Sequence, residues 1–120
     1  MIQVQFLDNS ISNEGEVVTP FDLDDAGAMR RVMRCQNMVS AAIQVDVVTG
    51  TGSAFVLDVI VSCDPKGKIF QVHPSTIQLT NTAKVTPVFS VAGYLWVGVK
   101  LNTVNGGNAK ADIYIVTKDA

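Results

Sequence analysis

The histidine at position 73 is the first residue to consider for chemistry, because it is the only histidine in the 120-residue chain. A serine nucleophile of the triad type needs a histidine beside a serine and a carboxylate. Ser75 is close to His73 in sequence, but it lies in no nucleophile-elbow motif. The sequence therefore predicts no catalytic residue and no enzyme, and a small hydrolase using His73 is only a third hypothesis.

The most acidic stretch, residues 21–28, is the one segment that suggests a metal site. Calcium prefers several carboxylate oxygens within one short loop, and Asp22 and Asp24 match the first two ligand positions of an EF-hand. Ala26 stands where a third oxygen ligand belongs, and Met33 stands where the closing glutamate belongs. A short helical turn capped by Asp22 or Asp24 is therefore favoured, with calcium binding across Asp22–Asp25 as the alternative.

The two cysteines, Cys35 and Cys63, have a spacing that matches no metal motif. With a single histidine in the chain, a zinc site of four protein ligands is not expected. Each cysteine sits among apolar residues, which favours two reduced thiols in the core. We therefore predict no metal and no cofactor.

Three aromatic residues suggest a binding surface. Tyr94 and Trp96 are two residues apart, and Tyr114 lies on the next expected strand. Alternation along strands would place all three on one sheet face, where they would form a second layer of the core, a subunit contact or a platform for stacking sugars. The sequence leaves these three alternatives open.

The charge balance bears on the partners. Nine lysines and arginines against eleven acidic residues give a net charge of -2, which argues against nucleic-acid binding. Arg30, Arg31 and Arg34 form the one basic cluster, read either as a solvated edge with salt bridges or as a contact for a charged partner. The charged fraction of 17% is below the average of about 25%, which suggests extensive β-structure or surface buried against other subunits.

The apolar runs are too short for a membrane span, which needs about 18 or more consecutive apolar residues. The first residues lack the basic region and long apolar segment of a secretion signal. We therefore expect no membrane association and no signal peptide, with folding in a cytoplasm.

Alternating apolar residues between turn signals predict an all-β fold. The expected strands lie at 2–7, 29–35 (where a strand is preferred to a helix end), 39–47, 54–63, 68–73, 75–81, 84–91, 94–101 and 109–116, and 16–19 is a further short candidate. Asp64-Pro65-Lys66-Gly67 predicts a turn, and Pro87 predicts that the strand at 84–91 lies at a sheet edge or carries a bulge. The spacing of these strands predicts an antiparallel β-sandwich or jelly roll of about eight to nine short strands with at most one helical turn. Residues 1–120 form a single domain in this interpretation.

Two local predictions are sharper than the rest. Residues 93–120 read as a β-hairpin, because Asn105-Gly106-Gly107-Asn108 joins two alternating runs and such residues accept the positive φ of a hairpin turn. The strand at 54–63 is apolar on both faces, since Val56 and Ile60 flank Asp58 opposite the main apolar stripe. Such a strand must be buried on both sides, within the domain or against another copy.

From about Met38 onward the chain resembles small β-sandwich proteins of tailed-phage virions. The segments that carry the resemblance are 42–47, 62–67, 93–99 and 105–109. They resemble the strand, the Asp-x-x-Gly hairpin, the Gly-Tyr-x-Trp-like strand and the final Gly-rich hairpin of those proteins. The resemblance covers about two-thirds of the length, and it assigns no functional residue.

The resemblance implies a non-enzymatic structural virion protein, assembled in the host cytoplasm. Within the group, the expected role is a capsid decoration or cement protein that binds the major capsid protein as a homo-oligomer, with a trimer as the first expectation. The alternative is a carbohydrate-binding adsorption, tail or fibre module that uses Tyr94, Trp96 and Tyr114. The same residues, together with Val56 and Ile60, are the candidate interface.

Overall fold

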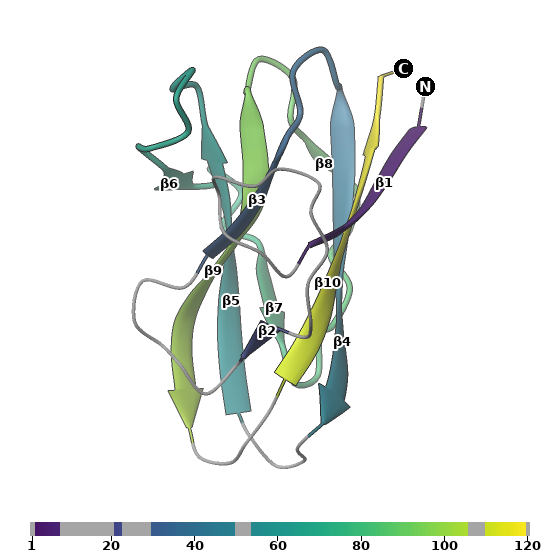
Figure 1. Cartoon of the computed structure of the whole chain (residues 1–120), viewed down its shortest axis with the longest axis vertical. Coiled ribbons are helices and arrows are strands. Elements are labelled where there is room, and N and C mark those ends of the chain that lie inside the picture. Colours follow the sequence, from purple (N-terminus) through teal and green to yellow (C-terminus); the bar gives the residue numbers. More distant parts are fainter. Residues whose placement is uncertain (1, 8–20, 23–29, 50–53, 106–109, 120) are drawn as a thin grey trace.

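The computed structural model consists of two antiparallel β-sheets (Figure 1). It describes residues 2–7, 21–22, 30–49, 54–105 and 110–119, and the side chains within 32–47, 54–103 and 111–119. The described ranges contain ten strands and no helix. The predicted all-β, antiparallel fold is therefore confirmed, with the strand count slightly above the expected number.

Sheet A has the order β1–β10–β4–β8, and β2 also pairs with β10. Its strands are β1 (Ile2–Leu7), β2 (Phe21–Asp22), β4 (Ser40–Thr49), β8 (Phe89–Ser90) and β10 (Lys110–Lys118). Ile2 lies opposite Lys118, so the two ends of the chain meet at one end of the molecule (Figure 1). Asp22 belongs to β2, and the rest of the predicted calcium or helical-turn stretch lies outside the described residues, as does the strand expected at 16–19.

Sheet B has the order β3–β9–β5–β6, and β7 pairs with another part of β5. Its strands are β3 (Arg30–Arg34), β5 (Ala54–Ser62), β6 (Gln71–Val72), β7 (Gln78–Thr80) and β9 (Trp96–Asn105). The edge position of β3 confirms the strand interpretation of residues 29–35. β5 is a central strand, with β9 on one side and β6 and β7 on the other.

The main core lies between the sheets and follows the period-two alternation of their central strands. Ile43, Ile113 and Ile115 of sheet A and Leu57, Val59, Val97 and Val99 of sheet B are all at most 1% exposed. Because alternate residues of a strand point to opposite faces, this packing fixes which side chains lie on the outer faces of the two sheets.

The predicted hairpin at residues 93–120 is wrong. β9 pairs with β3 and β5 in sheet B, whereas β10 pairs with β1, β2 and β4 in sheet A. The connection 106–109 therefore links the two sheets rather than two neighbouring strands. An amphipathic strand buries its apolar face equally well in either arrangement, so the alternation and turn residues of the sequence could not distinguish them.

Two predicted strands are much shorter in the structure. The strand expected at 68–73 is reduced to β6, because residues 64–69 form a loop whose backbone N–H groups are bound by the Asp64 carboxylate. The strand expected at 84–91 is reduced to β8 and to one isolated bridge between Val85 and Gln44. β8 lies at the edge of sheet A, which is the first of the two alternatives, an edge or a bulge, that Pro87 predicts for this segment.

A buried histidine joins the two sheets at one edge of the sandwich. His73, 5% exposed, follows β6 of sheet B, and its Nε2 donates a hydrogen bond to the carbonyl oxygen of Ser90 in β8 of sheet A at 2.8 Å. Its Nδ1 accepts the backbone N–H of Ser75 at 3.1 Å, which assigns the ring proton to Nε2. The ring packs edge-on against Phe89, with 5.2 Å between the ring centroids.

Candidate functional site

The three aromatic residues predicted to share one surface do not lie together. Tyr114 is in β10 of sheet A, Trp96 is in β9 of sheet B, and Tyr94 precedes β9 and packs against the main core. The placement of Tyr114 follows directly from the failed hairpin prediction, which had made β9 and β10 neighbours. The common aromatic platform behind the carbohydrate hypothesis is therefore absent.

Trp96 is covered by the chain itself. Its side chain is only 7% exposed and packs on the outer face of sheet B with Val32 and Ile60. Its Nε1 donates a hydrogen bond to the carbonyl oxygen of Asp64 at 3.0 Å. A Cβ atom on Gly67 would lie 3.0 Å from Cε2 of the indole, so only glycine fits over the ring without displacement.

The second apolar face of β5 is also covered from within. Ile60 is 2% exposed and belongs to the Trp96 cluster, against which Phe70 and Leu95 pack, while Val56 is half-buried. The prediction that this strand is buried on both faces is confirmed for Ile60. The cover over Ile60 comes from this chain and requires no second copy.

The arginine cluster lies along the edge strand β3. Arg34 is half-buried; its guanidinium lies 5.3 Å from the Trp96 ring centroid and donates a hydrogen bond to Oε1 of Gln36 at 3.1 Å. Arg30 and Arg31 pair through their backbone with Lys100 and Val99, and their side chains are outside the described set. Arg34 and the loop at residues 64–69 together cover the Trp96 ring, and we call this cover the lid over Trp96.

The two cysteines differ in environment. Cys35 is fully buried, and burial, followed by the proximity of Cys63, raises the pKa of its thiol to about 12. Cys63 is exposed, contrary to the core position predicted for it, because β5 ends at Ser62. Both thiols are free.

His73 and Ser75 do not form a nucleophilic pair. Ser75 contributes its backbone N–H to the imidazole, and the other ring nitrogen is used by the carbonyl of Ser90. Both nitrogens of the buried imidazole are therefore used in hydrogen bonds to the backbone. The described residues contain no cluster of three or more histidine, cysteine or acidic side chains that could hold a metal ion.

The feature that sequence reasoning missed is a rigid loop directly after β5. The carboxylate of Asp64 accepts backbone N–H groups from Lys66 at 3.0 Å, Lys68 at 2.9 Å and Ile69 at 3.2 Å. These hydrogen bonds lower the pKa of the Asp64 carboxyl below its ordinary value. Gly67 takes a φ of +64° and donates its N–H to the Asp64 carbonyl, which confirms the turn predicted at 64–67.

The Asp64–Ile69 loop holds an aliphatic side chain out in solvent. Ile69, which directly follows the turn, is 71% exposed, and Val72 of β6 is 45% exposed. Because Asp64 fixes the backbone on both sides of the turn, Ile69 is presented without the entropy that a floppy loop would lose on contact. A signal for this was present in the Asp-Pro-Lys-Gly turn, but the alternation at 68–73 suggested a strand instead.

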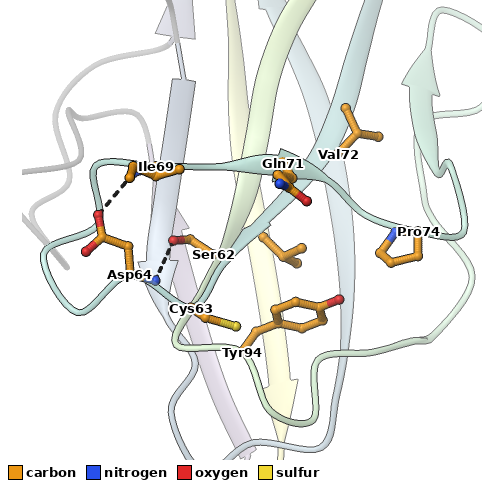
Figure 2. Close-up of a pocket in the computed structure, with 9 residues that line it drawn as sticks. Ser62, Cys63, Asp64, Ile69, Gln71, Val72, Pro74 and Tyr94 are labelled. Carbon is orange, nitrogen blue, oxygen red and sulfur yellow. Dashed lines mark hydrogen bonds between the residues drawn. The ribbon is translucent and has the colours of Figure 1, made fainter.

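A groove of about 320 Å³ lies beside this loop (Figure 2). Figure 2 shows Cys63 and Tyr94 on one side of it, with Ile69, Gln71 and Val72 on the other. Among the described residues that line it, Asp64 is the only charged one, and its carboxylate is already bound by three backbone N–H groups. The arrangement suits contact with an uncharged, apolar segment better than polar chemistry.

A second hollow of about 440 Å³ continues on the other side of Tyr94. It is lined by residues 36–39 and 92–95. Val39, at its rim, is 46% exposed. Tyr94 therefore stands between two hollows, and it is one of the predicted interface residues that stay partly accessible.

The fold is a small antiparallel β-sandwich, and its most exposed aliphatic loop lies beside a groove. No protein-family model and no curated protein matches the sequence. Among solved structures, the chain is similar to the crystal structure of the SPBc2 prophage-derived protein YomS. The TM-score is 0.55 at 8% sequence identity, with 98% of this chain and 94% of that chain covered. At this identity, the likeness shows a shared fold.

Within the described residues, no helix is long and apolar enough to cross a membrane.

Proposed function

We propose that this protein is a non-enzymatic structural component of a phage particle. The observation that carries the proposal is the Asp64–Ile69 loop, whose backbone is bound by the Asp64 carboxylate and which presents an exposed aliphatic residue beside a groove of mixed apolar and polar lining. Exposed apolar side chains on a rigid scaffold favour protein–protein contact, because little ordering entropy opposes association. The shared fold with a prophage-derived protein supports a phage setting.

More specifically, we propose a capsid decoration or cement protein that binds the major capsid protein as a homo-oligomer, with a trimer as the first expectation. Its place is the virion, with assembly in the host cytoplasm. A protein that reinforces a capsid needs a complementary contact surface rather than a reactive centre. The architectural use of both nitrogens of His73 is consistent with this.

The test is co-sedimentation with tail-less heads and with isolated tails of the phage whose genome encodes the chain. We expect binding to heads and a loss of at least about tenfold in affinity for Ile69→Ser, which removes the aliphatic contact. Val88→Ser is the matched control, because Val88 is equally exposed at 74% but lies outside the groove.

Binding to tails alone would reject the decoration role. Binding to neither would reject a structural virion role. Head binding that is equally weakened by Val88→Ser would show that the groove is not the contact.

A further inference from the structure

A buried carboxylate lies on the outer face of sheet B, and the contact surface proposed above does not use it. Asp58 is in the middle of β5, between the core residues Leu57 and Val59, so alternation places it on the opposite face of the strand. Its side chain is only 8% exposed. Burying a carboxylate is unfavourable unless its oxygens are hydrogen-bonded, so an aspartate at this position needs a reason other than packing.

Two amide side chains bind this carboxylate from the neighbouring strands. Nε2 of Gln78 in β7 donates to Oδ1 of Asp58 at 2.9 Å, and Nδ2 of Asn102 in β9 donates to Oδ2 at 2.8 Å. Since β7 and β9 lie on opposite sides of β5, the two amides flank the carboxylate (Figure 1). A carboxylate only accepts hydrogen bonds, so each amide turns its nitrogen toward Asp58 and its oxygen away from it.

A β-bulge places Asn102 beside the carboxylate. Leu101 and Thr103 of β9 lie opposite two consecutive residues of β5, so Asn102 between them is an extra residue with no partner of its own. Leu101 keeps its place in the core, while Asn102 is exposed. Bulges of this kind re-aim a side chain and are over-represented beside functional sites.

The two amides are exposed and keep free hydrogen-bonding capacity. Over the described part of the chain, no hydrogen bond is found for the oxygen or the second N–H of Gln78 or Asn102. Each amide therefore offers one acceptor and one donor to solvent. Lys100, also exposed, lies directly opposite Asp58 and offsets its negative charge, so the surroundings favour an uncharged ligand.

We propose that Gln78 and Asn102 bind a neutral sugar, with Asp58 as the residue that positions them. These three residues are the amide site. Each hydroxyl of a vicinal diol donates one hydrogen bond and accepts another, which matches the acceptor and the donor that each amide presents. Because Asp58 already fixes both amides, little conformational entropy is lost when they bind.

A peptide ligand could use the same amide groups, but the surroundings favour a sugar. Protein contacts depend on an apolar or aromatic anchor, and the exposed described residues that flank the site, Lys100 and Thr103, provide none. The site relies on hydrogen bonds and differs from the aromatic platform considered from the sequence. None of its three residues lines the groove beside the Asp64–Ile69 loop, so the sugar site is independent of the proposed capsid contact.

The experiment is an NMR titration of the isotope-labelled protein with glucose, galactose, mannose and N-acetylglucosamine at millimolar concentrations. The side-chain NH₂ resonances of Gln78 and Asn102 report on the site, and those of Gln44, an exposed amide on sheet A, are the internal control. We expect at least one sugar to shift the first two and to leave Gln44 unchanged. Gln78→Ala and Asn102→Ala should each weaken binding by about tenfold, whereas Gln44→Ala should not.

The positioning role is tested with Asp58→Asn, which keeps the shape of the side chain. Circular dichroism should remain that of the wild type, while NMR relaxation should show more mobile NH₂ groups at Gln78 and Asn102 in the free protein. Sugar binding should fall by about tenfold, although Asp58 does not contact the ligand. Unchanged amide mobility together with unchanged binding would show that Asp58 positions neither amide.

Three outcomes overturn the sugar site. The first is that no sugar in the panel shifts the Gln78 and Asn102 resonances, and the second is that Gln44→Ala weakens binding as much as Asn102→Ala does. The third is a response to N-acetylalanine methylamide, a mimic of the peptide backbone, without a response to any sugar, which would assign the site to a peptide. Binding of the same variants to phage heads is measured separately and decides the proposed function independently.

Discussion

The outer faces of the two sheets differ in whether their side chains are covered by the chain or exposed. On sheet B, Val32, Ile60 and Trp96 are nearly inaccessible, because the chain returns over them after β5. On sheet A, Asp46 and Val116 remain accessible, and no loop within the described ranges covers them in the same manner. Apolar residues outside the main core are thus covered by the chain on sheet B and left accessible on sheet A and at the Asp64–Ile69 loop.

This difference between the two sheets changes how the aromatic residues are interpreted. Trp96, the most attractive candidate for a ligand platform, is an internal part of the fold. The accessible aromatic groups are Tyr94, between two hollows, and Tyr114, on the opposite sheet. A single tryptophan on a strand therefore says little about binding until the loop that follows the neighbouring strand is placed.

Trp96→Ala is expected to have the largest effect on stability of the variants that compare the two sheet faces. Removing the buried indole leaves a cavity under Gly67 and the Asp64 carbonyl without its donor, so unfolding free energy should fall by about 3–5 kcal/mol. Tyr114→Ala, on the accessible sheet, should cost much less. Urea unfolding followed by circular dichroism measures both, and equal losses would show that the two faces are alike.

A pair of glycine substitutions sharpens the same point. Gly67 and Gly93 both have positive φ, so alanine at either position costs roughly 1 kcal/mol for the backbone alone. Only at Gly67 does the new methyl group meet the Trp96 ring, whereas nothing lies within 4 Å of it at Gly93. Gly67→Ala should therefore be the more destabilising in chemical denaturation, and a reversed order would contradict the lid over Trp96.

Acid should act on the loop that forms this lid. The pKa of the Asp64 carboxyl is lowered in the folded state, so its stabilising effect is present above the ordinary value of 3.8 and is lost as pH falls through the folded value. Wild-type thermal stability should therefore decrease more steeply below about pH 4 than that of Asp64→Asn. Parallel pH profiles would show that the carboxylate does not hold the loop.

The smallest expected effect concerns the two cysteine thiols, which should differ in reactivity. Cys63 should react with a thiol reagent in the folded protein at neutral pH, while Cys35 should not, because it is buried and its pKa is raised to about 12. Mass spectrometry should find one label on folded wild type, none on Cys63→Ser and two after unfolding in urea. Labelling of Cys35 in the folded state would contradict the closed core.

The sequence was sufficient for the elements whose signal is local. The two-faced apolar pattern of residues 54–63 correctly predicted a strand buried on both faces at Ile60, and Asp64-Pro65-Lys66-Gly67 correctly predicted a turn. It was insufficient where the outcome depends on pairing across the fold. Asn105–Asn108 suits a hairpin and a crossing between sheets equally, and choosing wrongly moved Tyr114 to the wrong sheet.

The candidate site was less accessible to prediction for the same reason. Lys68 to His73 alternates as a strand would, but Asp64 takes the backbone N–H groups of Lys68 and Ile69 that a strand would give to a neighbour. The burial of Trp96 depends on the register that places it opposite Ser62, two residues before that turn begins. Neither fact can be read from spacing along the chain alone.

The central claim, that this chain covers its own Trp96 and makes contacts elsewhere, is tested most directly by acrylamide quenching of tryptophan fluorescence. Trp96 is the only tryptophan, so the signal reports on one site. We expect weak quenching and a blue-shifted emission that are the same in dilute protein, in concentrated protein and in Ile69→Ser. Strong quenching in dilute protein that disappears on assembly would contradict the account, because Trp96 would then be part of the contact surface.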